Sequence, residues 1–353
     1  MDCWQAAIED VGPAGVDKGQ GARYLILPPG YASTIPDGYV AMPSENYKGY
    51  ALLRSIPRAA DVLSIEKAIT YAKRIRLYPL SEAMNPPNTV YVDALGKLFD
   101  STIPYDLRFF ASLDRMIQYE PWIARDKVMI DILKTIGIEK GKPFAPNLLT
   151  QKILYEAVRD AREWIHARYD TLFTPPYFEA THWALPVSRD LADAVSAHFA
   201  DPDNYPLDGR GLAFSYAFFT AKHFGQRQLY LMTIKDKNGQ PFRSEKTYRL
   251  KVAANLPAAQ YWSITVYDSA THAFIRNANR MNRSSHSANM QVNSDGSVDI
   301  YFGPKAPPGK ESNWIPTPSD CGFEVLFRLY GAMGELFEKK WRMDDVEEII
   351  DAG

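Results

Sequence analysis

The sequence contains few of the residues and motifs on which many functional sites depend. Among its 353 residues there are only 2 cysteines, Cys3 and Cys321, which stand near opposite ends of the chain. Neither cysteine belongs to a CxxC spacing, so the sequence indicates neither a disulfide framework nor a thiolate metal site. We interpret both as small buried hydrophobic residues, and whether they pair with each other stays open.

Other absences argue against whole classes of protein. No apolar run approaches the roughly 18 residues needed to span a bilayer. The formal net charge is -2, with acidic and basic residues interspersed, so neither nucleic acid nor an anionic membrane is an expected partner. No dinucleotide-binding, P-loop, GxSxG, HExxH or EF-hand motif is present. The 6 histidines show no metal-ligand spacing, so we predict no metal and no cofactor.

Aromatic residues and proline are abundant instead. The chain has 21 Tyr, 17 Phe, 7 Trp and 25 Pro. This composition fits strands joined by packed loops, and it fits an aromatic binding surface equally well. Composition alone does not distinguish a fold rich in strands and packed loops from an aromatic binding surface.

The first half of the chain changes character near residue 58. Residues 1–57 predict β-structure, because an apolar run, Tyr24 to Leu27, is stopped by Pro28-Pro29-Gly30. Residues 58–175 predict a helical segment, because apolar side chains recur at helical spacing. The helical stretches lie at 59–77, 104–120, 124–138 and 147–173. Pro104 opens the second stretch, and Gly137 is the expected cap of the third.

Residues 176–353 predict a C-terminal antiparallel β-sandwich. Short helical stretches come first, and strands follow from "QLYLMTIKDKNGQPF" onward. Asn238-Gly239 is a strong hairpin signal, and Tyr248, Leu250 and Val252 alternate along one strand. Repeated short strands with Gly, Asn and Asp turns are typical of a sandwich rather than a parallel sheet. The predicted fold class is therefore α+β.

The candidate binding residues lie in a polar stretch between strands, "HAFIRNANRMNRSSHSANMQ". Arg276, Arg280, Arg283 and His286 stand there with several asparagines and few apolar residues. Guanidinium groups and amides that converge at the mouth of a sandwich would bind an anion or a sugar. The alternative is a solvated loop whose arginines pair with nearby acids.

Two further segments contain candidates. Asn313-Trp314 precedes two prolines in "NWIPTP", where Trp314 is either a stacking platform for a sugar ring or, as we favour, a plug that closes the sandwich. "GLAFSYAFFTAKHFG" contains His223, a weak catalytic candidate together with His286. We favour a simpler role for Lys222-His223, as cations at a helix C-terminus.

Several long motifs carry a resemblance to a known family. They are "MDCWQAAIEDVGPAGVDKGQGARYLILPPGY", "IPYDLRFFASLDRMIQYEPW", "YWSITVYDSATHAFIRN", "NSDGSVDIYFGPKAP", "NWIPTP" and "FRLYG". Together they resemble the bacterial family that pairs the domain of unknown function DUF1254 with DUF1214. The resemblance implies a β-domain, a helical segment and a C-terminal β-sandwich.

The resemblance also bears on the start of the chain. In the family, the segment that resembles "MDCWQAAIEDVG" lies inside the first β-domain, after a P-N-x-D-T type motif. An export signal precedes that domain in many members, which are exported or periplasmic. The resemblance therefore implies that the front half of the first domain is missing here. Strands near Arg23–Leu27 would then leave an open edge, through which the chain could form oligomers.

Three functional hypotheses remain open. The first is a cell-envelope binding or scaffold protein whose sandwich loops hold a polar or carbohydrate-like ligand. The second is a hydrolase or lyase that acts on a glycan or small acid through a histidine–carboxylate pair in a polar pocket. The third is an assembly role, for which an exposed apolar patch would be the largest surface feature.

Overall fold

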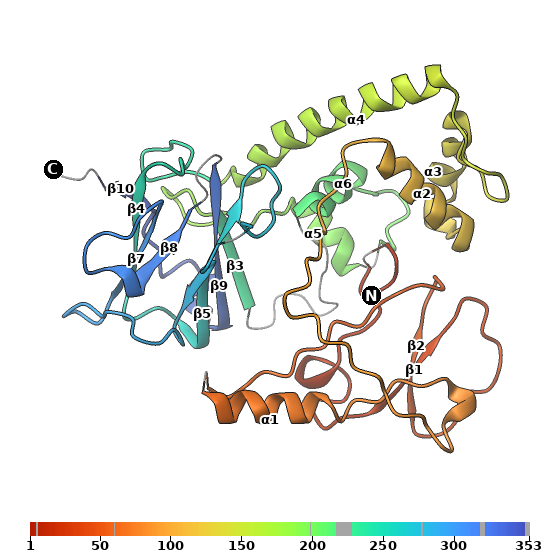
Figure 1. The fold of residues 1–353 in the computed structure, drawn as a ribbon, viewed down its shortest axis with the longest axis horizontal. Helices are drawn as coiled ribbons and strands as arrows, with labels where there is room; N and C mark the ends of the chain where they lie inside the picture. Colours follow the sequence, from red (N-terminus) through yellow and green to blue (C-terminus); the bar gives the residue numbers. More distant parts are fainter. Residues whose placement is uncertain are drawn as a thin grey trace. The chain divides into compact units, whose positions relative to one another are not determined.

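The fold is that of a computed structural model, which describes residues 1–4, 6–59, 61–197, 199–216, 228–276, 278–317 and 322–349. The contacts divide the chain into two compact units, and the boundary falls within the long helix α4 (Leu148–Tyr169). Unit 1 contains Met1–Trp164, and unit 2 contains Ile165–Tyr216 and the strands from Gln228 onward (Figure 1). The three-part division at residues 57 and 175 stays a prediction.

Unit 1 begins with a short β-structure. After the 3-10 helix η1 (Gly12–Ala14), the strands β1 (Arg23–Leu27) and β2 (Tyr39–Pro43) pair in parallel. β1 lies where the sequence predicts a strand, and the pair forms a sheet of two strands. An isolated pair buries little apolar surface, and Leu27 and Met42 are the side chains it does bury.

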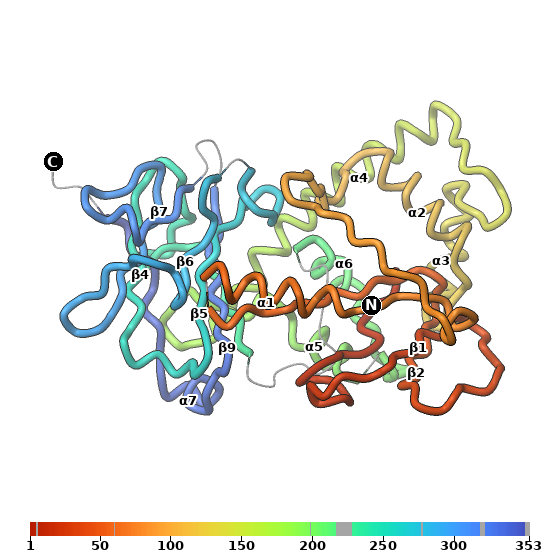
Figure 2. Tube along the Cα trace, turned by 60° about the horizontal axis from the view of Figure 1, so that its bottom comes forward, coloured from red at the N-terminus to blue at the C-terminus, as the bar shows by residue number. Residues whose placement is uncertain are grey.

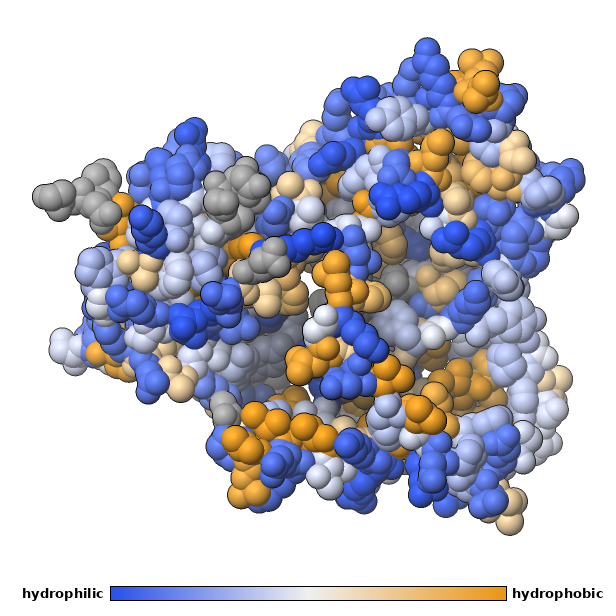
Figure 3. Space-filling model, in the orientation of Figure 1, coloured by the Kyte–Doolittle hydropathy of each residue, from blue (hydrophilic) through white to orange (hydrophobic). Residues whose placement is uncertain are grey.

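The next segment leaves its apolar side chains exposed. Helix α1 (Val62–Ala72) has an N-cap at Asp61, whose side chain accepts a hydrogen bond from the Ser64 amide at 2.8 Å. No residue of α1 is buried, although its apolar stripe has the predicted spacing. Figure 3 shows apolar side chains gathered over this helix, and Val62, Leu63, Ile65 and Ile69 are among those exposed. The 3-10 helix η2 (Leu80–Glu82) follows.

The packed core of unit 1 is helical. Helix α2 (Leu107–Tyr119) begins after Asp106, which caps the Arg108 amide at 2.8 Å, so the N-cap stands two residues after Pro104. The 3-10 helix η3 (Ala124–Asp126), α3 (Lys127–Ile132) and the 3-10 helix η4 (Leu133–Ile136) follow, and Gly137 ends them at a φ of 86°, which favours glycine. Phe110, Ile117, Ile130, Ile138, Leu154 and Val158 form the buried cluster.

Unit 2 is built around two four-stranded sheets. One sheet has the order β3-β9-β5-β6, from Gln228–Thr233, Phe323–Ala332, Ala258–Asp268 and Asn282–Ser284. The other has the order β10-β4-β7-β8, from Glu347–Ile349, Thr247–Val252, Val298–Gly303 and Trp314–Pro316. Figure 2 shows the two sheets from another side.

The sandwich is confirmed, with one difference in strand direction. All pairs within the two sheets are antiparallel except β7 with β8, which is parallel. The buried faces meet in one core, and Tyr248, Leu250 and Val252 contribute to it as the alternation predicts. Trp183 is fully buried in the same core and donates its Nε1–H to the Asp344 carbonyl at 2.9 Å.

Helices cover the second face of the β3-β9-β5-β6 sheet. The last turn of α4, the 3-10 helix η5 (Asp170–Phe173) and α6 (Leu207–Tyr216) pack there against Met232 and Leu326. Helix α5 (Arg189–Ser196) contacts α6. The short elements η6 (Glu311–Asn313) and α7 (Gly334–Phe337) complete the unit. The sheet therefore separates a sandwich core from a second, smaller apolar cluster.

Candidate functional site

The arginine-rich stretch runs along an edge where the two sheets meet. Its strand β6 is the last strand of one sheet, β8 is the last strand of the other, and the two are in contact. Arg280 donates from Nη1 to the carbonyls of Glu311 at 2.6 Å and Trp314 at 3.0 Å. Arg280 therefore fastens the polar stretch to the corner that begins β8.

Arg283 lies on β6 and faces the interior of the sandwich edge. It stands opposite Ile264 in the strand register, and Ile264 is a fully buried core residue. Its Nε is buried without a hydrogen-bond partner, and no carboxylate among the described residues pairs with its guanidinium. Burial, followed by the positive charge of Arg280, lowers the pKa of Arg283. The two residues, here called the arginine pair, lie near enough at the sandwich edge for the charge of Arg280 to act on Arg283.

Asn313 and Trp314 serve the structure of the same corner. The Asn313 amide is 2% exposed, and its Nδ2 donates to the Gln291 carbonyl at 2.9 Å and the Asp299 carbonyl at 2.8 Å. Trp314 is half-buried and donates its Nε1–H to the Gly303 carbonyl at 2.9 Å. These contacts fit the favoured role of Trp314 as a plug that closes the sandwich.

The remaining candidates are spread out. His286 is exposed, and its ring lies 4.9 Å from the ring of Tyr261, centroid to centroid. Arg276 is exposed in the turn that precedes the arginine pair. His223 and Cys321 lie outside the residues that the structure describes. The structure thus brings Arg280 together with Arg283 and Trp314, and it places His286 beside a tyrosine instead.

The second face of the sheet contains a buried carboxylate that the sequence did not predict. Glu324, on β9, is 0% exposed. One of its oxygens is hydrogen-bonded to Nδ1 of His272, and the other accepts from the Tyr169 hydroxyl at 2.6 Å. Burial raises the pKa of Glu324, and the bonds from His272 and Tyr169 offset only part of this effect. We call Glu324, His272 and Tyr169 the Glu324 cluster.

The chain after β5 holds His272 in place. The Asp268 carboxylate accepts from the amides of Ala270 at 2.8 Å and Thr271 at 3.0 Å, which closes a tight turn. The His272 amide then donates to the Asp268 carbonyl at 2.8 Å, and His272 takes a φ of 53°. A left-handed conformation is uncommon for a residue other than glycine. The turn therefore directs the imidazole onto Glu324.

A row of hydrogen-bonded polar side chains, several of them tyrosines, continues along this face. Arg328 donates to the hydroxyls of Thr265, at 3.1 Å, and Tyr267. Further along, the Tyr230 hydroxyl donates to the Tyr330 hydroxyl at 2.8 Å. In the sequence, the only signal for this site is the charge at two alternate positions of the strand "FEVLFRLYG", Glu324 and Arg328.

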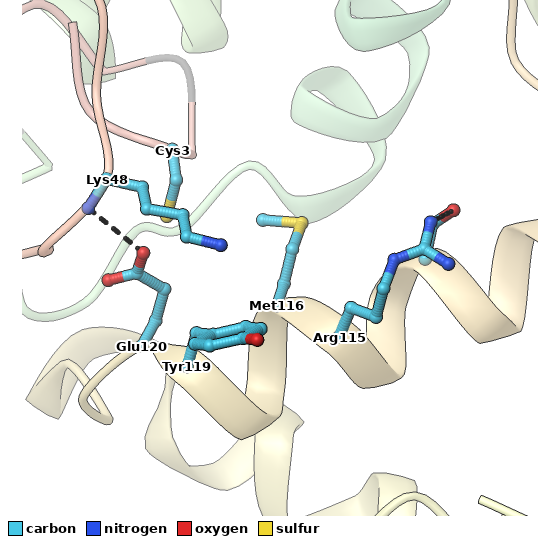
Figure 4. Close-up of a pocket in the computed structure, with 7 residues that line it drawn as sticks. Cys3, Lys48, Arg115, Met116, Tyr119 and Glu120 are labelled. Carbon is cyan, nitrogen blue, oxygen red and sulfur yellow. Dashed lines mark hydrogen bonds between the residues drawn. The ribbon is translucent and has the colours of Figure 1, made fainter.

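Unit 1 has a pocket of about 270 Å³ between its first residues and α2 (Figure 4). Glu120, at the end of α2, is buried and accepts from the amides of Tyr47 at 2.7 Å and Lys48 at 3.0 Å. The Lys48 ammonium lies 3.9 Å from the centre of the Tyr119 ring. These contacts fasten the loop before α1 to α2, so we assign the pocket a structural role.

The Cys3 thiol in this pocket is expected to be unreactive. Burial, together with the negative charges of Glu120 and Asp2, raises the pKa of Cys3 to about 12. The thiolate is the reactive form, so little of it exists near pH 8. Iodoacetamide should therefore alkylate Cys3 far more slowly than free cysteine, as followed by peptide mass spectrometry. Equal rates would contradict this burial.

The described residues offer no metal centre and no membrane span. Nowhere among them do three His, Cys, Asp or Glu side chains gather as they would around a metal ion. Within the same residues, no helix is long and apolar enough to cross a bilayer.

The fold and its polar sites define a protein of two α+β units whose C-terminal β-sandwich carries an arginine pair at its edge and a buried carboxylate on one face. Residues 1–79 match DUF1254 and residues 227–333 match DUF1214, both described as proteins of unknown function. The chain thus matches both members of this domain pair, as its motifs suggested. No curated protein matches the sequence.

Similarity to a solved structure supports the fold. The VPA0106 protein from Vibrio parahaemolyticus is similar, with a TM-score of 0.50 and 17% identity over 95% of this chain and 77% of that chain. An uncharacterized protein from Burkholderia cenocepacia matches with a TM-score of 0.30 and 14% identity, over 60% of this chain and 46% of that chain. The first similarity supports the fold alone, and the second is too low to support a conclusion about this chain.

Proposed function

We propose that unit 2 is a binding module for a polar ligand that carries an anionic group, and that the arginine pair holds that group. The observation that carries the proposal is the unpartnered, buried Nε of Arg283. Buried donors in proteins are nearly always hydrogen-bonded, so a buried donor that no protein group satisfies fits a contact to a ligand.

The charges favour an anion over a neutral ligand. Arg280 and Arg283 repel each other, since the charge of Arg280 helps to lower the pKa of Arg283. A carboxylate or phosphate between them would remove this repulsion and accept a fork of two hydrogen bonds. An acidic sugar combines such a group with hydroxyls, which suits the asparagines and Arg276 of the same stretch. His286 could extend the site toward Tyr261.

The test compares two sugars that differ in one group. Glucuronate carries a carboxylate where glucose carries a hydroxymethyl group, so we expect glucuronate alone to raise the melting temperature and to bind in isothermal titration calorimetry. Arg283→Met should abolish the response, because it removes the donor while keeping much of the side-chain volume. Inorganic phosphate, included as a third ligand, shows whether the sugar hydroxyls contribute.

The control is Arg243→Met in the same unit. The Arg243 side chain is 67% exposed, and its Nη1 lies 4.0 Å from Oε1 of Glu245. Its replacement should therefore leave glucuronate binding intact. If neither glucuronate nor phosphate binds to the wild-type protein, or if the Arg283→Met variant binds them as tightly as the wild type does, the proposed site is wrong.

Arg283→Met should also stabilise the ligand-free protein. The substitution removes a partly buried charge that lies beside another cation and pairs with no described acid. We expect the free energy of unfolding to rise by about 1 kcal/mol, as is common when a functional residue is replaced by one that packs better. Urea unfolding without ligand measures the change, and a loss of stability would indicate that Arg283 has a structural role.

A further inference from the structure

The Glu324 cluster has the geometry of an acid–base centre. The carboxylate of Glu324 is bound on both oxygens, by His272 Nδ1 and by the Tyr169 hydroxyl. The His272 side chain is 6% exposed, and its second nitrogen, Nε2, is buried without a hydrogen-bond partner. Nδ1 is thus held by the Glu324 carboxylate, whereas Nε2 has no protein partner and is the nitrogen that a bound molecule would contact.

The protons of the cluster determine what Nε2 can do. When Glu324 and His272 together hold one extra proton, Nε2 carries a hydrogen and is a donor, whichever group holds that proton. When this proton leaves, the Glu324 carboxylate accepts from Nδ1–H and from the Tyr169 hydroxyl, and Nε2 becomes an acceptor. Tyr169 remains a donor in both states, because burial and the charge of Glu324 raise its pKa.

The surroundings of His272 are apolar and aromatic. The ring of Tyr169 lies 4.1 Å from the imidazole, and the rings of His166 and Tyr216 lie at 6.0 Å and 6.4 Å, all measured between centroids. Phe173, Leu212 and Met232 belong to the same buried cluster. Two further charged groups act on the cluster: Asp170, on η5, acts on Tyr169, and Asp268, at the end of β5, acts on Glu324. The Asp268 carboxylate also accepts the two amide hydrogen bonds of its turn.

We propose that His272 is a catalytic acid–base residue for a small, mainly apolar molecule bound at Nε2, and that Glu324 and Tyr169 are its positioning residues. This site is separate from the arginine pair: Arg283 faces the sandwich core, whereas Glu324 stands opposite Tyr267 on the other face of the sheet. The failure of one site leaves the other intact.

The proposed step is the activation of water for attack on an ester. The lone pair of Nε2 takes a proton from water, so an O–H bond breaks, an N–H bond forms and the electron pair stays on oxygen. That oxygen attacks the acyl carbon, and the bond to the leaving alkoxide breaks with its electron pair. The proton on Nε2 then passes to the leaving oxygen, which restores the starting state. Glu324 stabilises the imidazolium that exists between the two transfers.

Access to Nε2 is tested first, in the unaltered protein. Diethyl pyrocarbonate acylates unprotonated imidazole nitrogens, and Nδ1 of His272 is occupied by Glu324. Peptide mass spectrometry should find His272 modified at Nε2. If His272 stays unmodified while the exposed His286 is fully modified, no molecule reaches Nε2 and the proposal is wrong.

Turnover is tested with 4-nitrophenyl acetate, an activated ester whose release of 4-nitrophenolate is followed by absorbance. We expect His272→Gln to lower the rate by about tenfold or more. Glu324→Gln keeps an acceptor for Nδ1 but removes the charge, so it should shift the pH profile of the rate, which a purely structural residue would not do.

His182→Gln is the matched control. His182 is likewise bonded to a carboxylate, with Nδ1 3.0 Å from Asp345, but its side chain is 32% exposed. Its replacement should leave turnover unchanged. If wild-type protein and His272→Gln cleave the ester equally fast, or if His182→Gln loses as much activity as His272→Gln, the assignment is overturned.

Discussion

Replacement of His272 by leucine is expected to lower the free energy of unfolding by about 3–5 kcal/mol. Among the described residues, the change leaves the fully buried Glu324 carboxylate with the Tyr169 hydroxyl as its remaining donor. An unpaired buried charge costs far more than the pair contributes, because its desolvation is no longer offset. Urea unfolding at pH 8 measures the loss.

The loss should depend on pH. Burial already holds the folded pKa of Glu324 above its unfolded value, and removal of His272 raises it further. A carboxyl with a raised folded pKa costs no stability below its unfolded pKa, about 4, and the penalty appears as the pH rises through the folded pKa. The variant should therefore be closest to wild type near pH 4 and furthest from it at pH 8.

A triple replacement serves as the control. His272→Leu, Glu324→Leu and Tyr169→Phe together remove every polar group of the Glu324 cluster, so stability should return to near the wild-type value or exceed it. If His272→Leu is equally destabilised at both pH values, the lost packing of the ring and not the carboxylate is responsible.

Unit 1 should respond very differently to two equivalent truncations. Ile117 on α2 is 2% exposed in the core, whereas Ile69 on α1 is 49% exposed. Ile117→Ala should cost about 2–5 kcal/mol, because it leaves a cavity. Ile69→Ala should change stability by no more than about 0.5 kcal/mol. Chemical unfolding of both variants measures the contrast, and a large loss at Ile69 would mean that α1 is covered in solution.

Local sequence signals predicted the elements of this fold well. The cap at Gly137 and the alternation around Leu250 appear as expected, because each depends on neighbours in the chain. Asn238-Gly239 forms a turn across the bridge between Lys235 and Pro241, but the strands on either side of it, β3 and β4, lie in different sheets and form no hairpin. Strand direction was harder: β8 pairs in parallel with β7, and its three residues are too few to give a pattern. The apolar stripe of α1 has the predicted helical spacing, but periodicity shows which residues share a face and not what covers that face.

The candidate sites show the same limit. The arginine pair was predicted as part of a longer polar stretch, since two arginines three residues apart stand out in a sequence. The Glu324 cluster was missed because Tyr169, His272 and Glu324 are far apart in the chain and come together only when α4, the turn after β5 and β9 pack. Glu324 alternates with the core residues Val325 and Phe327 along β9, but the helices that bury the face of Glu324 are a tertiary feature.

The most direct measurement of ligand binding at the sandwich edge follows the Nε–H signal of Arg283 by NMR during titration with glucuronate. We predict that this signal shifts and becomes protected from exchange with water, while the Nε–H signal of Arg243 does not change. A titration that binds glucuronate but leaves the Arg283 signal unchanged would place the site elsewhere. A titration without binding would contradict the assignment of unit 2 as a module for anionic ligands.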